Sequence, residues 1–197
     1  MTGVVGSQER LIEAAQEVLV EGQGHMEMQA VAKRAQVSVG LAYHHFGSKA
    51  GLIAAVVEAF YAQLETAVFR EPKWPYATWA EKEKGRIGAY ISFHYDHPFA
   101  RLAIGTLSRA PEVLDVEADF SNRQLAGGAK MLIAAQRDGT IPADVDPHLT
   151  IALMSGGIRQ ALIYAMRQDP RPHPDELTEN VWAFIAAALR LTPPLVA

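Results

Sequence analysis

The chain has 197 residues, of which 49% are hydrophobic, and its formal net charge is −4. This composition supplies a core for one small and one larger helical domain and gives no sign of a general polyanion binder. Cysteine is absent, which excludes disulfides, thiolate metal ligands and thiol nucleophiles. Residues 1–6 do not resemble a signal peptide, and no apolar run reaches the roughly 20 residues that span a bilayer. We therefore expect a cytoplasmic protein without a membrane partner.

Apolar residues recur at helical spacing along the whole chain, and the sequence predicts an all-α fold. Two short helical patterns meet at residues 36–38, and a further helix begins at Ser48 and ends before Pro72. After a loop at residues 71–76, helices are expected at about 78–96, 117–137, 147–168 and 175–191, with breaks at prolines and glycines. No sustained strand alternation and no repeat is present. The first apolar stripe comprises Leu11, Ile12, Ala15, Val18 and Leu19.

Residues 27–49 are the most informative stretch, because their two short helices and turn have the layout of a helix-turn-helix. Val37 is expected to place an apolar side chain in the turn. Ser38 stands where the second helix must begin, so its hydroxyl is expected to cap free backbone N–H groups. Ala42 and Phe46 lie four residues apart and are expected to point inward together.

The remaining face of this second helix suits a DNA major groove. Leu41 is expected to touch a thymine methyl and His44 to hydrogen-bond a base edge or a phosphate, while Gly40 allows close backbone approach. Tyr43 and Lys49 are interpreted as phosphate contacts, because Lys49 lies near the N-terminus of the next helix. The predicted DNA-contacting residues are Gln29, Ser38, Val39, Gly40, Leu41, Tyr43, His44 and Lys49.

These residues resemble the signature of the TetR family of bacterial transcriptional regulators. The matching segments are Val31-Ala32, Ala35-Gln36-Val37-Ser38, Gly40 to Phe46 and Ser48-Lys49. The resemblance implies a three-helix DNA-binding domain, assigned to residues 5–65, followed by a C-terminal ligand-binding and dimerisation domain, assigned to residues 66–197. The resemblance is specific over roughly the first third of the chain. In the remainder, only the chain length and the helical periodicity agree with the family.

Three features depart from the family pattern. Gln36 replaces the usual turn glycine, so the backbone there must avoid a positive φ or bear some strain. Met26 and Glu27 replace a pair of hydroxyl residues, which removes a helix cap and a phosphate donor. Gly22 and Gly24 are expected to make the approach to the second helix loose.

Charge sets a further expectation for the first 50 residues, which contain four Lys or Arg and five Glu. A nearly neutral domain with few phosphate-neutralising groups should bind DNA modestly, so specific binding should depend on two copies acting together.

The resemblance implies a sequence-specific transcriptional regulator that has no enzymatic activity and no cofactor, and that binds palindromic double-stranded DNA as a homodimer. Repression relieved by a hydrophobic or aromatic small molecule is the commoner outcome in the family, and activation stays open. The expected mechanism is a population shift, in which the ligand favours a conformer that does not fit the operator. The helix that begins at Ser48 would act as the lever, because it joins both domains.

The last two helices are the predicted dimer interface, because they are more apolar than a helix with one buried face requires. Two such helices from each chain would form a four-helix bundle, and ordinary intrachain core is the alternative. The candidates are Ile151, Met154, Gly157, Ile158, Ala161, Phe184 and Ala188.

The middle helices are the predicted sensor. Tyr90, His94, Phe120 and Arg123 are the candidate ligand contacts, because they combine polar groups with apolar surroundings.

Two other classes of protein stay open. The segment from His94 to His97 places two histidines and an aspartate within four residues, a set that a divalent metal in an enzyme would accept. A further ligand at convincing spacing is missing, so the sequence predicts neither a metal site nor catalytic residues. It also contains no Gly-rich phosphate loop and no nucleophile elbow. The low basic charge keeps open a helical protein-binding module that lacks DNA affinity.

Overall fold

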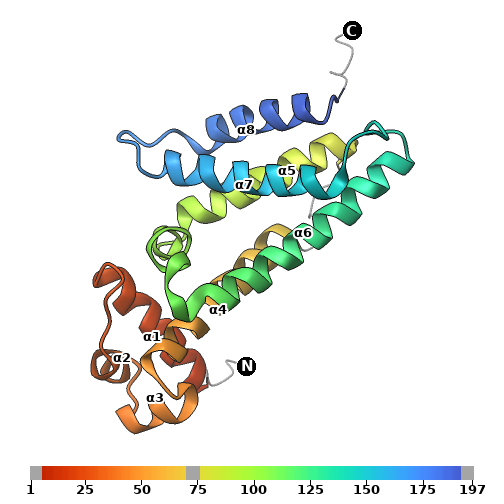
Figure 1. Cartoon of the computed structure of the whole chain (residues 1–197). Coiled ribbons are helices and arrows are strands. Elements are labelled where there is room, and N and C mark those ends of the chain that lie inside the picture. Colours follow the sequence, from red (N-terminus) through yellow and green to blue (C-terminus); the bar gives the residue numbers. More distant parts are fainter. Residues whose placement is uncertain (1–5, 70–75, 192–197) are drawn as a thin grey trace. The chain divides into compact units, whose positions relative to one another are not determined.

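The computed structural model describes residues 6–69 and 76–191, and its regular elements are helices (Figure 1). The described residues form no strand, and the predicted all-α fold is confirmed. The chain divides into an N-terminal unit, Met1–Leu64 with His97–Asp119, and a C-terminal unit, Glu65–Asp96 with Phe120–Ala197. The sequence did not predict that residues 97–119 group with the first unit. The assignment of functions to residues 5–65 and 66–197 stays a prediction.

The N-terminal unit is organised around three short helices and most of a longer one (Figure 1). Of the predicted first stripe, Leu11, Ala15 and Leu19 are fully buried and the other two residues are half-buried. They support the packing of the first helix against the next two. The elements are α1 (Ser7–Glu21), α2 (Met28–Arg34), α3 (Val39–Phe46), α4 (Lys49–Phe69), η1 (Leu102–Thr106), η2 (Leu107–Arg109), η3 (Pro111–Val113) and the start of α6 (Leu114–Arg137).

By length and composition alone, α4 is long and apolar enough to cross a membrane, which corrects the expectation that no segment would be. Within the N-terminal unit, however, Leu52, Val56 and Phe60 of this helix are fully buried. Tyr61 is buried as well, and its hydroxyl donates a hydrogen bond to the carboxylate of Glu117 on α6. Core packing therefore accounts for the hydropathy of α4 in this unit.

Helices α1, α2 and α8 (Pro174–Ala188) end in the same backbone motif. The residue after the C-cap is Gln23, Gln36 or Arg190, with φ of 52°, 55° and 53°. The N–H of the following residue donates to the carbonyl three positions before the C-cap, which is the Schellman arrangement. At Gln36 the backbone thus adopts the positive φ that the family's usual glycine would permit at lower cost.

The turn between α1 and α2 is tight, contrary to the expectation that Gly22 and Gly24 would loosen it. A Cβ atom at Gly22 would collide with the carbonyl oxygen of His25. Gly24 has φ of 97°, and its N–H donates to the carbonyl of Leu19 at 2.8 Å. Both glycines are therefore required by the geometry of the turn.

The C-terminal unit contains α5 (Trp79–Asp96), most of α6, α7 (Pro147–Ala165) and α8, and α8 packs on both α5 and α7 (Figure 1). An ion pair of 2.7 Å between Lys84 and Glu179 joins α5 to α8. A Cβ atom at Gly128 would collide with Ile151, so the glycine lets α6 and α7 approach closely. The four predicted helices are present with ends shifted by up to a turn. The predicted loop at residues 71–76, except for Tyr76, lies outside the described residues.

Candidate nucleic-acid interface

The turn between α2 and α3 is held by backbone and side-chain hydrogen bonds. Gln36 supplies the left-handed residue, and the N–H of Val37 donates to the carbonyl of Ala32 at 3.0 Å. Ser38 then begins α3, where its Oγ accepts the N–H of Leu41 at 3.1 Å. The predicted N-cap at Ser38 is therefore present, and it fixes the direction in which α3 leaves the turn.

One side of α3 packs against the unit and the other faces solvent. Ala42 is fully buried and Phe46 is half-buried, which agrees with the inward face expected for them. Tyr43 is 47% exposed, so its ring is accessible to a partner. In the predicted DNA-contacting set, the half-buried residues are Val39 and Leu41, and the exposed residues are Gln29, Ser38, Gly40, Tyr43, His44 and Lys49.

His45 has a positioning role that the sequence did not reveal. Its Nε2 lies 2.8 Å from the hydroxyl oxygen of Ser7, at the start of α1 and 38 residues earlier in the chain. The contact ties α3 to α1 and leaves the adjacent His44 exposed. No local sequence signal marks this pair, because its two members meet only through the tertiary fold.

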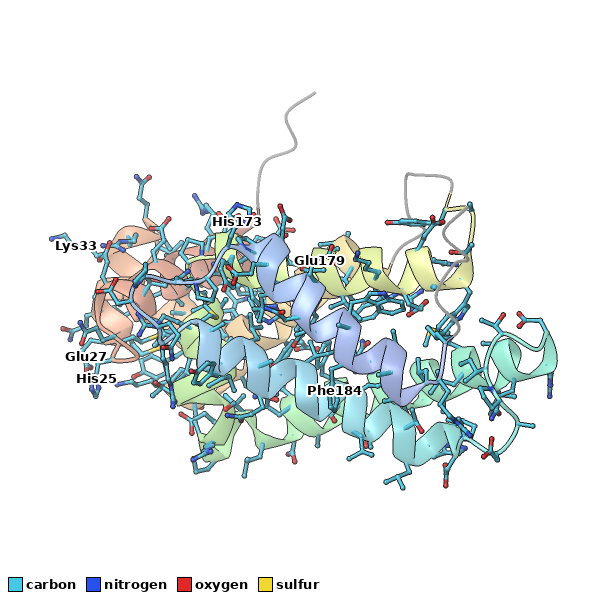
Figure 2. The ribbon with its side chains drawn as sticks, turned by 90° about the horizontal axis from the view of Figure 1, so that it is seen from above. His25, Glu27, Lys33, His173, Glu179 and Phe184 are labelled. Atoms are coloured by element: carbon cyan, nitrogen blue, oxygen red, sulfur yellow. The ribbon has the colours of Figure 1, made fainter. Side chains whose placement is uncertain are left out.

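Carboxylates accompany two of the cationic residues of the unit. Arg34 pairs with Glu21 at 2.6 Å and with Glu17 at 3.6 Å, and hydrogen bonding from Arg34 lowers the pKa of Glu21. Lys49 Nζ lies 3.4 Å from Glu27 Oε1. Figure 2 shows Glu27 projecting from the N-terminal unit, together with His25 and Lys33. Arg34 and Lys49 are thus each already paired with a carboxylate.

Comparison with known proteins identifies the helix-turn-helix. Residues 11–56, which contain α2, α3 and parts of α1 and α4, match the model of bacterial regulatory proteins of the tetR family. Residues 11–56 are therefore similar to the DNA-binding segment of that family. The resemblance found in the sequence is confirmed over residues 11–56, the stretch that the family model covers. No curated protein matches the chain.

Solved structures with the same fold extend the likeness along the chain. GusR of Salmonella enterica has a TM-score of 0.75 and 21% identity, over 96% of this chain and 98% of its own. FadR of Bacillus subtilis, solved in complex with stearoyl-CoA, has a TM-score of 0.74 and 21% identity, over 91% and 97%. FadR of Bacillus halodurans, a fatty acid degradation regulator, has a TM-score of 0.76 and 17% identity, over 97% and 100%. At these identities the likeness shows a shared fold.

The four residues chosen as ligand contacts lie in different environments. His94 is fully buried, its Nδ1 donates to the carbonyl of Tyr90 at 2.8 Å, and the two rings have centroids 4.3 Å apart. Phe120 is buried on α6. Arg123 is exposed, and its Nε donates to Glu65 at 3.1 Å. The structure thus joins Tyr90 and His94 in one interior cluster, whereas Arg123 is engaged at the surface.

An ion pair on α5 between a buried glutamate and a half-buried arginine was absent from the chosen set. Glu83 is 5% exposed and accepts a hydrogen bond of 3.0 Å from Arg86. Burial raises the pKa of Glu83, and the charges of Arg86 and Lys82 oppose the shift. The same guanidinium nitrogen lies 3.1 Å from the sulfur of Met131. The signal in the sequence was a glutamate one helical turn before the core residue Ile87, on the apolar face of the helix.

The predicted dimer residues divide into inward and outward sets. Met154 is buried, Ile151, Ile158 and Ala161 are half-buried, and Gly157, Phe184 and Ala188 are exposed. Phe184, labelled on α8 in Figure 2, is 70% exposed. Three exposed apolar residues on one face of α7 were not chosen: Leu149, Leu153 and Tyr164, with exposures of 59%, 65% and 65%. Their helical spacing of four and eleven residues was the available signal.

The histidines at the end of α5 do not gather into a metal site in the structure. Among residues 6–69 and 76–191, no group of three or more His, Asp or Glu residues is placed to hold a metal ion. His94 contacts its own helix, and His97 lies 3.1 Å from the side-chain oxygen of Gln63. Burial lowers the pKa of His97.

Proposed function

We propose that this chain is a transcriptional regulator of the TetR type, a repressor that binds a palindromic operator as a homodimer and leaves it when a small apolar or aromatic molecule binds the C-terminal unit. The observation that carries the proposal is α3, a capped helix whose buried side anchors it and whose outer side offers Gly40, Tyr43 and His44 to a partner. A helix presented in this way can enter a major groove.

The side chains of α3 suggest a division of labour at the DNA. Leu41 and His44 would read base edges, the first through a thymine methyl and the second through a hydrogen bond. Tyr43 and Lys49 would contact phosphates, which fixes the register of the helix but adds no sequence information. Gln29, at the start of α2, would add a polar contact from the neighbouring helix.

The exposed apolar side chains of α7 and α8 support a homodimer. Leu153, Tyr164 and Phe184 are each at least 65% exposed, although burying such side chains is favourable by about 1.5–3 kcal/mol for a large aliphatic residue. Two α7 and two α8 helices from a symmetric pair would cover them in a four-helix bundle. A two-fold dimer would present two copies of α3 to half-sites about 34 Å apart.

The C-terminal unit is the proposed ligand sensor. The FadR structure from Bacillus subtilis contains stearoyl-CoA within a similar fold, which supports ligand binding as a property of this architecture. In this chain Tyr90, His94 and Phe120 supply aromatic and apolar surface, and Arg123 with Arg86 supplies cationic groups. A ligand would act by favouring a conformer with poor operator fit, through a coupling of about 1–3 kcal/mol.

Selection of duplexes from a random library, followed by binding measurements on variants, tests the proposal. Leu41→Ala and His44→Ala should change base preference, whereas Tyr43→Ala and Lys49→Ala should weaken binding to all sequences. Lys130→Ala, which removes an exposed charge from α6, is the matched control. The assignment fails if none of the four substitutions changes binding.

A further inference from the structure

We propose that the carboxylate of Glu27 is an internal competitor of DNA phosphate for Lys49, and that it limits the affinity of the N-terminal unit for DNA. The inference rests on the proposed role of Lys49 as a phosphate contact. In this role Glu27 weakens DNA binding and makes no contact with the DNA itself.

The contact itself is an exposed ion pair across two helix starts. Lys49 Nζ and Glu27 Oε1 are 3.4 Å apart, although the residues are separated by 22 positions in the sequence. The side chains are 45% and 83% exposed, so both charges remain open to exchange with solvent ions or phosphate. A lysine ammonium is a mobile point charge that can change partner without losing a fixed geometry.

Glu27 has no competing structural task in the described contacts. It occupies the N-cap position of α2 with φ of −118° and ψ of 137°, but its side chain makes no capping hydrogen bond. At the other helix, Ser48 Oγ accepts the N–H of Gly51 at 3.0 Å, so the start of α4 is satisfied by its own serine. The carboxylate of Glu27 is therefore available to Lys49.

Both ends of the pair are held in place by the surrounding fold. Met26 and Met28, which flank Glu27, are 3% and 4% exposed, so the backbone between them is anchored and Glu27 points outward. A Cβ atom at Gly51 would collide with the carbonyl oxygen of Phe46, so the turn from α3 to α4 is tight. The two backbone positions are thus fixed, so the carboxylate stays within reach of the cation that α4 would offer to DNA.

Counterion release gives the expected size of the effect. Lys49 releases about 0.9 of a counterion when it neutralises a phosphate, but the abandoned Glu27 carboxylate must then take up a cation beside the DNA. The uptake offsets the release in the wild type. Glu27→Gln removes the uptake, so the slope of log K against log salt should become steeper by about 0.9 for each protomer, or about 1.8 for the proposed homodimer. Between 50 and 200 mM salt, the affinity advantage of Glu27→Gln should then fall by about three- to fourfold for each protomer, or about twelvefold for the homodimer.

The experiment uses the full chain and two labelled 30-base-pair duplexes, one enriched by the wild type from a random library and one of scrambled sequence. Fluorescence anisotropy measures binding from 50 to 200 mM KCl for the wild type, Glu27→Gln and Glu27→Thr. Glu13→Gln is the control, because Glu13 is an exposed glutamate on α1 and its loss changes the net charge equally. We expect both Glu27 variants to bind both duplexes about threefold or more tightly at 50 mM and with the steeper slope.

Lys49→Met distinguishes competition from simple repulsion. Adding Glu27→Gln to Lys49→Met should improve binding less than it does in the wild type, since no lysine is then released. Circular dichroism melting checks that every variant is folded.

Unchanged affinity and slope in folded Glu27→Gln would overturn the inference. Weaker binding confined to the enriched duplex would do so as well, because it would make Glu27 an acceptor for a base amino group. If neither the wild type nor Glu27→Gln binds either duplex at 50 mM, the DNA-binding function itself is wrong. If only the Glu27 variants bind, the competitor role is supported.

Discussion

Replacing Gln36 with glycine should stabilise the N-terminal unit. Gln36 has φ of 55° in the turn of the helix-turn-helix, and its side chain is exposed. The left-handed conformation costs a residue with a Cβ atom about 1–2 kcal/mol. Glycine avoids this cost but loses about 0.5–1 kcal/mol more conformational free energy on folding. The difference predicts a net stabilisation of about 0.5–1 kcal/mol.

Local amide exchange measures this change in the relevant unit. The N–H of Val37 donates to the carbonyl of Ala32 across the turn, so its exchange reports the opening of the α2–α3 junction. A stabilisation of 0.5–1 kcal/mol should slow that exchange by about two- to fivefold if the amide exchanges through this opening. Thermal unfolding of the whole chain should shift upward by about 1–4 °C.

Two further glutamine-to-glycine variants separate backbone strain from other effects. Gln23→Gly, at φ of 52°, should also stabilise the protein. Gln16→Gly lies inside α1 and should destabilise it by about 0.5–1 kcal/mol, because glycine is a poor helix former. The reasoning is refuted if Gln36→Gly destabilises the protein as Gln16→Gly does, since strain would then not be what distinguishes the two positions.

The remaining predictions concern a cap, a titration and an interface. Ser38→Ala should destabilise the unit by about 1 kcal/mol in urea titrations, whereas Ser38→Asp should retain most of the cap. Burial lowers the pKa of His97 from 6.5, so the unfolded chain binds its proton more readily. Stability should therefore fall as the pH drops below about 6.5, and His97→Gln should flatten this dependence in denaturation measured from pH 7 to 5. Leu153→Glu and Phe184→Glu should convert the proposed dimer into monomers in sedimentation velocity, and a dimer that survives both would place the interface elsewhere.

Local signals explain what the sequence could predict. The helix start at Ser38 depends on a side chain that accepts the N–H group three residues later, and this cap is present. Helix periodicity likewise places Leu11 and Ala42 in the core. Such features lie within one or two turns of chain, so neighbouring residues are enough to determine them.

Contacts between distant residues explain what the sequence could not predict. The pairing of His45 with Ser7 depends on the arrangement of α1 and α3, which no local pattern encodes. On α7, Leu153 is exposed and the adjacent Met154 is buried. A helix with apolar residues on more than one side does not reveal which side faces its own core. The predicted interface for this reason mixed Met154, which packs inside the unit, with residues that face outward.

The expected affinity for DNA depends on which cations of the N-terminal unit are paired with carboxylates, and not only on how many cations there are. A nearly neutral sequence predicts modest affinity for DNA, but it leaves each cation equally available to phosphate. In the structure Arg34 and Lys49 are paired with carboxylates, whereas Arg10 and Lys33 are exposed. A paired cation must exchange a carboxylate for a phosphate when the protein binds DNA. Its contribution to the binding free energy is therefore smaller than that of a cation that was only hydrated. Discrimination between sequences should then depend on the base contacts of α3 and on the presentation of two copies, because little non-specific attraction remains to obscure them.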